Sequence, residues 1–251
     1  MKVLTIQNCA IEGFGPYSRH LRESGVEAEV VHAYRDEPLP PLESAQAVLV
    51  HGTPVSVYAP QLPDFLRREL AWLGRALERG MPCLGICGGA QALALLLGAG
   101  VRRNPRLEIG AREVRLTAAG RADPLLRDFP GRFPVIEWHG DTFDVPTSGA
   151  LLAEGDDCRN QMFRHGNVVG LQFHLEADAA DVAVWSDAYA GELAEAGRTK
   201  DEVVAECRSL EAAMDPLARA LMTRFLEGVA SPTGGPRPQS GPPDPDPGRE
   251  S

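Results

Sequence analysis

Short runs of consecutive apolar residues alternate with longer amphipathic segments along the first hundred residues. The apolar runs predict buried strands, which span residues 3–7, 26–32, 45–50 and 82–86. The segments between them predict helices at residues 16–24 and 63–79, and a third helix begins just after residue 87. Continuous apolar strands separated by helices are typical of a parallel sheet covered on both faces. We therefore expect an α/β fold with a doubly wound, mostly parallel sheet whose functional side chains lie at the carboxyl ends of its strands.

The pattern changes to mostly β beyond residue 100. Short segments bounded by turn residues predict strands at 101–103, 111–116, 132–138, 151–153, 161–164 and 168–173. We expect these strands to extend the sheet and to add a small antiparallel piece. Two C-terminal helices are predicted at residues 179–196 and 200–229, and the periodic apolar positions of the second indicate a face packed on the core.

The end of the chain differs in composition from the rest. Residues 231–251 contain seven prolines and four glycines with hardly any apolar side chain. Such a segment cannot bury enough surface to offset the entropy of ordering it, so we expect a disordered tail. Residues 1–229 are predicted to form a single domain, in which residues 200–229 are an appended C-terminal helix.

The overall charge narrows the choice of partners. The 251 residues carry a formal net charge of −10, which argues against a nucleic-acid-binding surface or an anchor for anionic membranes. No apolar run approaches the length of a transmembrane helix, and the first residues lack the pattern of a signal peptide. We expect a cytoplasmic protein with no nucleic-acid and no membrane partner.

The cysteines are scattered along the chain. There are five of them, an odd number, and none forms the paired C-x-x-C spacing that would indicate a zinc site or a disulfide framework. We therefore expect no metal, and four of the five cysteines are predicted to be inert thiols.

The remaining cysteine, Cys87, lies between an apolar strand pattern and an alanine- and leucine-rich helical pattern. A side chain at the tip of such a sharp turn brings the residues two before and two after it close together, where Gly85 and Gly89 avoid a clash. The start of the following helix favours a thiolate. We interpret Cys87 as an exposed, activated nucleophile, against the alternatives of a buried structural cysteine or a phosphate-binding loop.

A second stretch with chemical character ends the strand predicted at 168–173. His174 and Glu176 are two residues apart, so they project from the same face while the strand lasts. A thiol nucleophile needs an imidazole to transfer its proton, and the imidazole needs an acceptor that fixes its tautomer. Cys87, His174 and Glu176 can supply these three roles.

These two stretches together resemble a known family. Segment 85–91, which reads GICGGAQ, resembles the G-x-C-x-G-x-Q turn of class I (triad-type) glutamine amidotransferases, and segment 172–176, QFHLE, is similar to their Q-F-H-x-E segment. The resemblance covers roughly residues 1–190. Segments 138–146 (WHGDTFDVP) and 160–163 (NQMF) resemble the free-standing GMP-synthase-like subgroup.

The resemblance implies a flavodoxin-like sheet and hydrolysis of the glutamine side-chain amide. By this resemblance Cys87 attacks the amide carbon to form a glutamyl thioester. His174 then protonates the departing ammonia and activates water, while Glu176 orients His174. No cofactor is implied.

The resemblance also implies residues that surround the substrate. Main-chain N–H groups of Gly88 and of the loop at Gly52 and Thr53 would form the oxyanion hole. Gln91 matches the family position that contacts the substrate glutamine. The segment whose backbone receives the amino-acid end of the substrate corresponds to Trp138, His139, Gly140 and Asp141.

One position departs from the family pattern. The loop after the third strand usually reads G-G-P, and here Thr53 replaces the second glycine. A β-branched residue resists positive φ, so either the oxyanion hole forms only when a partner or substrate binds, or the loop uses an ordinary backbone conformation. His51, which precedes this loop, is a candidate pocket residue. Trp185 and Tyr189, one turn apart, are predicted to pack within a helix and not to form a substrate platform.

Three functions remain open from the sequence. The first is a glutaminase that releases ammonia for an acceptor on a separate synthetase subunit. The second is a free-standing hydrolase of another γ-glutamyl compound, which would use the same triad. The third is a catalytically weak regulatory or binding subunit, against which the presence of all three triad residues argues.

Overall fold

A nine-stranded sheet runs through the centre of the protein, whose structure is a computed structural model that describes residues 1–231. The strand order is β2-β1-β3-β4-β9-β8-β7-β5-β6. The first five strands in this order are parallel to one another, namely β2 (Glu27–His32), β1 (Lys2–Gln7), β3 (Ala47–Val50), β4 (Cys83–Ile86) and β9 (Val168–Leu171). The other four continue the sheet in antiparallel fashion, namely β8 (Met162–His165), β7 (Ala150–Glu154), β5 (Val101–Leu116) and β6 (Arg132–Phe143). The order β2-β1-β3-β4-β9 is the flavodoxin-like order, so the predicted fold class is confirmed.

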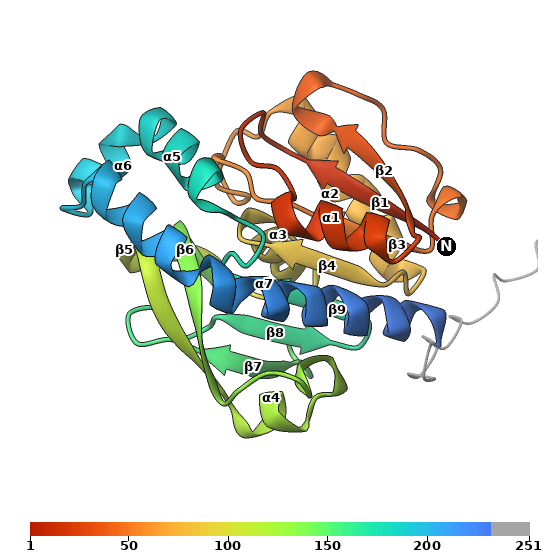
Figure 1. Cartoon of the computed structure of the whole chain (residues 1–251). Helices are drawn as coiled ribbons and strands as arrows, with labels where there is room; N and C mark the ends of the chain where they lie inside the picture. Colours follow the sequence, from red (N-terminus) through yellow and green to blue (C-terminus); the bar gives the residue numbers. More distant parts are fainter. Residues whose placement is uncertain (232–251) are drawn as a thin grey trace, which may run out of the picture.

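Helices cover both faces of the parallel part (Figure 1). One face is covered by α1 (Gly15–Glu23), α5 (Ala179–Ala188) and α7 (Lys200–Ala230), and the other by α2 (Asp64–Glu78) and α3 (Gly88–Leu96). Successive strand residues point to opposite faces, so Val3 and Leu49 pack in the first core and Leu4 and Val48 in the second. The remaining helical segments are short, namely α4 (Ala118–Ala122), α6 (Ala190–Glu195) and the 3₁₀ turns Ala33–Arg35, Leu42–Ser44 and Pro124–Leu126.

The long helix α7 crosses one face of the sheet (Figure 1). It begins at a capping box in which Thr199 accepts a hydrogen bond from the N–H of Glu202, and the Glu202 side chain accepts one from the N–H of Thr199. Its predicted apolar face is buried against the sheet, α1 and α5, with Leu221 and Phe225 in the first core. The predicted tail at 231–251 lies outside the described residues except for Ser231.

Four predicted boundaries are wrong in ways that affect the site. The strands expected at 101–103 and 111–116 are one continuous strand, β5, with an irregularity between Arg103 and Glu108. Strand β6 continues five residues beyond the predicted end at 138, so the motif at 138–143 is part of a strand. Between the two predicted strands, Glu108, Ile109 and Gly110 pair with β6, and this pairing with a distant strand satisfies backbone groups in a way that their own sequence did not indicate. The helix expected at 179–196 is interrupted at Tyr189, and β9 ends at Leu171, before His174.

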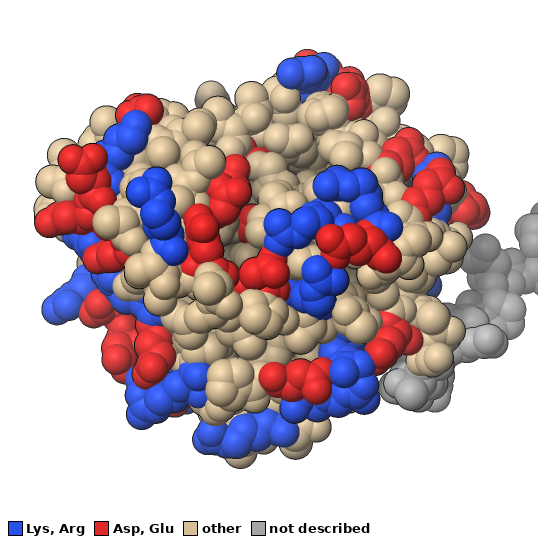
Figure 2. Space-filling model, viewed as in Figure 1, with Lys and Arg blue, Asp and Glu red and all other residues tan. Residues whose placement is uncertain are grey.

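The surface carries charges of both signs. On the face shown in Figure 2, Lys and Arg side chains are interspersed with Asp and Glu side chains, and neither positive nor negative side chains form a continuous patch. None of the helices within residues 1–231 is both long enough and apolar enough to cross a bilayer.

Candidate active site

A pocket lies at the carboxyl ends of the parallel strands. Cys87 follows β4, His174 comes shortly after β9, and Glu12 lies in the segment after β1. These side chains line the pocket together with Trp138 and Asp141 of β6. The crevice therefore lies where doubly wound sheets bind their ligands.

The turn at Cys87 is strained, as the sequence predicts. Cys87 has φ of 50° and ψ of −114°, an uncommon conformation for a residue with a side chain. A Cβ atom added to Gly85 would lie 2.6 Å from the backbone of Gly89, and one added to Gly89 would lie 2.2 Å from the carbonyl oxygen of Val50. The Cys87 N–H donates to the carbonyl of Leu171 at 2.7 Å, which fixes the turn to β9.

The sulfur of Cys87 lies in an environment that favours the neutral thiol. Burial raises the pKa of Cys87 above its usual value, and the negative charges of Glu12, Glu137 and Glu176 raise it further. The N–H of Gly88 acts in the opposite direction but does not outweigh these effects. The expectation that the helix start produces a thiolate is therefore wrong for the unliganded protein, because desolvation and nearby carboxylates dominate.

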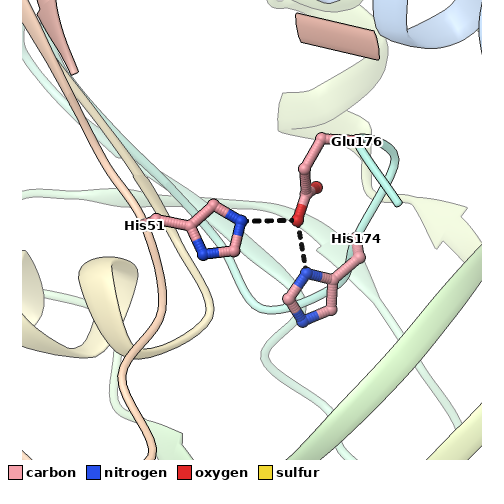
Figure 3. Close-up of side chains that lie close together, drawn as sticks. All are labelled: His51, His174 and Glu176. Carbon is pink, nitrogen blue, oxygen red and sulfur yellow. Dashed lines mark hydrogen bonds and ion pairs between the residues drawn. The ribbon is translucent and has the colours of Figure 1, made fainter. Parts of the chain in front are cut away.

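Glu176 accepts hydrogen bonds from two histidines through the same oxygen (Figure 3). Its Oε1 atom lies 2.5 Å from Nδ1 of His174 and 3.1 Å from Nε2 of His51. Burial alone would raise the pKa of Glu176, but its interactions with His174 and His51 lower it to about 2. Glu176 is therefore an ionised carboxylate inside the protein.

The imidazole of His174 is fixed on one side and free on the other. Its Nδ1 is bound by Glu176, and the ring packs edge-on against Trp185 with centroids 5.0 Å apart. Its Nε2 is buried and has no hydrogen-bond partner among the described residues. Because His174 lines the same pocket as Cys87, a neutral imidazole there can take a proton from a thiol.

The three residues expected to form an oxyanion hole lie against one another. A Cβ atom on Gly88 would lie 2.8 Å from the N of Thr53, and one on Gly52 would lie 3.5 Å from the Cβ of Cys87. Thr53 is not among the residues with positive φ, and its Oγ1 accepts a hydrogen bond from the N–H of Val55 at 3.2 Å. Of the two expectations for Thr53, the structure fits the ordinary backbone conformation.

The residues expected to bind substrate all line this pocket. They are Gln91, Trp138, His139, Gly140 and Asp141. The side-chain amide of Gln91 donates to the carbonyl of Asp141 at 3.1 Å, so Gln91 positions the β6 backbone. The indole N–H of Trp138 donates to Glu192 at 2.8 Å. The carboxylate of Asp141 accepts hydrogen bonds from Ser56 and Tyr58.

His139 and Gly140 have different neighbours. The Nε2 atom of His139 lies 3.0 Å from Glu108 and 3.1 Å from Glu137, so its ring is buried beneath the pocket. Burial alone would lower the pKa of His139, but these two carboxylates raise it to about 9. Gly140 lies against the guanidinium of Arg103, where a Cβ would be 2.1 Å from a guanidinium nitrogen.

Sequence reasoning missed several pocket residues and misplaced one. Glu12, Trp185, Tyr189 and Glu192 line the pocket, although the pair Trp185 and Tyr189 was expected only to pack within a helix. His51 does not line the pocket but is buried behind Glu176. No local motif marks these residues, because they reach the site from segments far apart in the chain.

Two buried groups offer three potential metal ligands each within 4.8 Å, among the described residues. They are His51, His174 and Glu176, and Glu108, His139 and Cys158. A catalytic zinc site takes three ligands from the protein. In both groups, however, a histidine nitrogen already lies within 3.1 Å of a carboxylate oxygen.

Comparisons with known proteins identify the family of this chain. Residues 17–181 match the family described as glutamine amidotransferase class-I. The chain is 31% identical over 215 residues to the glutamine amidotransferase-like protein YfeJ of Salmonella typhimurium, which covers 83% of this chain and 90% of that protein. A GMP synthase (glutamine-hydrolyzing) of Thermomicrobium roseum is 34% identical over 163 residues, which are 63% of this chain and 28% of that protein.

Two solved structures are similar to this protein over most of its chain. The crystal structure of a glutamine amidotransferase from Thermotoga maritima has a TM-score of 0.83 at 32% identity, and covers 90% of this chain and 98% of that chain. A glutamine amidotransferase from Methylobacillus flagellatus has a TM-score of 0.82 at 25% identity, and covers 90% of this chain and 94% of that chain. The matched family and these relatives show that the chain belongs to the class I glutamine amidotransferases, which are glutamine-hydrolysing enzymes with a cysteine nucleophile.

Proposed function

We propose that this enzyme hydrolyses the side-chain amide of glutamine through Cys87, His174 and Glu176, and that the ammonia passes to an acceptor on a separate synthetase. The observation that carries this proposal is the arrangement of the three side chains. A strained turn presents Cys87, and an ionised Glu176 fixes Nδ1 of His174 so that Nε2 stays free. The proposal treats residues 1–229 as one domain, since α7 packs on the same core as α1 and α5.

The reaction begins with a neutral thiol, in keeping with the raised pKa of Cys87. As Sγ attacks the amide carbon, Nε2 of His174 accepts the thiol proton, and Glu176 stabilises the imidazolium that forms. Main-chain N–H groups of Gly88 and of the Gly52–Thr53 loop stabilise the oxyanion. His174 then gives the proton to the departing nitrogen, which leaves as ammonia.

The second half of the reaction hydrolyses the thioester and regenerates the free enzyme. His174, again neutral, takes a proton from a water molecule that attacks the glutamyl thioester. Collapse of this second tetrahedral intermediate breaks the C–S bond, and the proton returns to the sulfur as glutamate forms. The pocket residues around Asp141 and Gln91 would hold the amino-acid end of the substrate through the β6 backbone.

The partner is proposed from the relatives. The segment similar to the Thermomicrobium roseum protein is 28% of a GMP synthase described as glutamine-hydrolyzing. This likeness supports a synthetase in trans as the acceptor of ammonia. The pocket does not distinguish glutamine from another γ-glutamyl compound, so the test below includes both.

The test combines trapping and turnover. The protein is incubated with 6-diazo-5-oxo-L-norleucine, a glutamine-like electrophile, and the adduct is located by peptide mass spectrometry. We expect one adduct at Cys87, with Cys83→Ser labelled like the parent enzyme and Cys87→Ser unlabelled. Ammonia release from glutamine and from γ-glutamyl peptides is then compared. Labelling at another cysteine, or none at Cys87, would overturn the assignment, and exclusive turnover of γ-glutamyl peptides would replace glutamine as the substrate.

A further inference from the structure

A carboxylate reaches the pocket from the segment that follows β1. Glu12 is only 9% exposed, and it lines the pocket together with Cys87 and His174. The residue before it is fixed to α5, because the indole N–H of Trp185 donates to the carbonyl of Ile11 at 3.0 Å. The same indole packs against the ring of His174. Glu12 is therefore held in a defined place beside the proposed base.

One oxygen of the Glu12 carboxylate is occupied and the other is available. Oε1 accepts a hydrogen bond from the hydroxyl of Tyr189 at 2.7 Å. Oε2 lies 3.6 Å from Nδ1 of His51, which is too far for a hydrogen bond, and it accepts none from the other described residues. A largely buried polar atom without a partner is costly, so an N–H group that enters the pocket finds a favourable acceptor here.

The available oxygen of Glu12 lies close to the nucleophile. A Cβ atom on Gly52 would be 2.8 Å from Oε2 of Glu12 and 3.5 Å from Cβ of Cys87, so both atoms lie within 3.5 Å of the same point. Glycine at position 52 leaves the space for this approach. Burial is the main reason for the raised pKa of Cys87, and Glu12 is the carboxylate that adds most to it.

The other carboxylates that line the pocket are paired or exposed. Asp141 accepts a hydrogen bond on each of its oxygens, from Ser56 and from Tyr58. Glu192 is exposed to solvent. Among the described residues that line the pocket, Glu12 is the carboxylate that combines burial with a free oxygen.

The proposed reaction leaves one direction for the nitrogen of the bound amide. The carbonyl oxygen points into the oxyanion hole, the carbon chain runs toward Gln91 of α3, and the nitrogen faces His174, which protonates it. Glu12 is tied to Tyr189, just after α5, and α5 and α3 cover opposite faces of the sheet. Glu12 thus approaches the reacting carbon from the side away from Gln91, which is the side left for the nitrogen.

We propose that Glu12 is a further catalytic residue, which accepts a hydrogen bond from the N–H of the scissile γ-amide through Oε2 and stabilises the nitrogen as it leaves. The proposal rests on the proposed function, in which His174 supplies the proton to that nitrogen. Glu12 neither gives nor takes a proton. The nitrogen keeps its own hydrogens, gains one from His174, and leaves with the electron pair of the C–N bond.

This hydrogen bond distinguishes an amide from an ester. Positive charge gathers on the nitrogen before the C–N bond breaks, so the bond to a carboxylate becomes stronger in the transition state. The leaving oxygen of an ester carries no hydrogen and gains nothing from Glu12. The site is therefore expected to favour γ-amides over γ-esters of glutamate.

The test compares two substrates that give the same product. We measure kcat/KM for glutamate formation from L-glutamine and from L-glutamate γ-methyl ester, in the parent enzyme and in Glu12→Gln, with Cys87→Ser as the blank. Both substrates use the same thiol and oxyanion hole and differ in the leaving atom. In the variant an NH₂ group replaces Oε2, while Oε1 can still accept from Tyr189. We expect the amide-to-ester ratio to fall by about tenfold or more, because a hydrogen bond to a charged group is lost.

Two further variants complete the test. Glu12→Asp keeps a carboxylate near the sulfur but withdraws it by one methylene, so it should lower the ratio in the same direction, and it decides the test if Glu12→Gln does not fold. The matched control is Glu69→Gln, which changes a buried glutamate of α2 outside the pocket and should leave the ratio unchanged. If γ-glutamyl peptides are the amides that are turned over, they take the place of glutamine in the ratio.

The outcomes separate this inference from the proposed function. An unchanged ratio in a folded Glu12 variant, or an equal fall in Glu69→Gln, would overturn the inference, because a merely structural role lowers the rates of both substrates alike. In that case labelling of Cys87 by 6-diazo-5-oxo-L-norleucine and glutamine hydrolysis by the parent would leave the proposed function intact. A parent enzyme that is not labelled at Cys87 and hydrolyses no γ-glutamyl amide would overturn both.

Discussion

Gly89 lies so close to Val50 that an added Cβ would come within 2.2 Å of the Val50 carbonyl oxygen. This contact lets helix α3 begin directly behind β3, which places Cys87 at the tip of its turn. Since the clash would be with backbone, no side-chain rotation can relieve it.

Replacement of Gly89 by Ala should therefore lower both the free energy of unfolding and the activity. We expect a loss on the order of 3 kcal/mol, because the backbone of β3 or α3 must shift. The matched control is Gly74→Ala in α2, where the nearest atom to the new Cβ is 3.9 Å away and the helix gains about 0.5–1 kcal/mol. Urea unfolding of both variants checks the prediction, which fails if the two changes have similar effects.

Replacement of Glu176 by Gln should lower kcat while the protein stays folded. The amide can donate as well as accept, so it no longer fixes Nδ1 of His174 as a donor and cannot stabilise an imidazolium. We expect a fall in kcat on the order of a hundredfold or more with little change in KM. Steady-state ammonia release measures this, and the exposed Glu78→Gln serves as control. A change confined to KM would show that Glu176 acts in binding and not through His174.

The buried carboxyl of Glu69 should make stability fall as pH rises. Burial raises the pKa of Glu69 to about 8, only partly offset by the hydrogen bond from Asn8, whereas its ordinary value is 4.5. The folded protein then keeps a proton between pH 4.5 and 8 that the unfolded chain has lost, so its unfolding free energy declines across this range.

Urea unfolding at pH 5 and pH 8 tests this for the parent and Glu69→Gln. We expect the decline of the parent to exceed that of the variant by on the order of a few kcal/mol. Glu78→Gln, on the exposed face of the same helix, should behave like the parent. Equal declines in the parent and Glu69→Gln would contradict a raised pKa.

The helix α7 should be part of the folding unit. Leu221 is fully buried in the core between the sheet and the helices α1, α5 and α7. Leu221→Ala should therefore lower the free energy of unfolding by about 2–5 kcal/mol. Exposed Ser209→Ala on the same helix should change the free energy of unfolding by less than about 0.5 kcal/mol. A small effect of Leu221→Ala in thermal unfolding would indicate that α7 is only loosely attached to the domain.

Replacement of Thr53 by glycine, the residue that the family pattern has at this position, should be tolerated. Thr53 has an ordinary φ, so Thr53→Gly removes no backbone strain and should leave kcat within about threefold. It does remove the acceptor for the N–H of Val55, and Thr53→Ser restores it. A large rise in glutaminase rate for Thr53→Gly alone would show that the side chain obstructs the hole.

The local part of the site could be predicted from the sequence. The turn at Cys87 is specified by its own neighbours, because the close approach at Gly85 and Gly89 involves residues two positions away from the cysteine. The pairing of His174 with Glu176 is likewise local, although β9 ends at Leu171 and the two side chains meet in the segment that follows it.

The charge state of the site could not be predicted in this way. Burial and three carboxylates from different segments oppose a thiolate at Cys87. The residues next to Cys87 in the sequence do not indicate these distant carboxylates. Similarly, the segment between the strands predicted at 101–103 and 111–116 was not expected to be a strand, whereas the pairing of Glu108, Ile109 and Gly110 with β6 makes it part of β5.

The sequence by itself determined the fold class, because periodic apolar runs alternate along the chain. It also determined the cysteine at its turn and the histidine and glutamate that accompany it, because each belongs to a short local motif. Only the tertiary structure decided that Glu12, at the pocket wall, and Glu176 lie on either side of the buried His51. Their meeting depends on the order in which β1, β3, β4 and β9 pair, which brings the carboxyl ends of strands from distant parts of the chain to one edge of the sheet. Such pairing is a property of the whole fold.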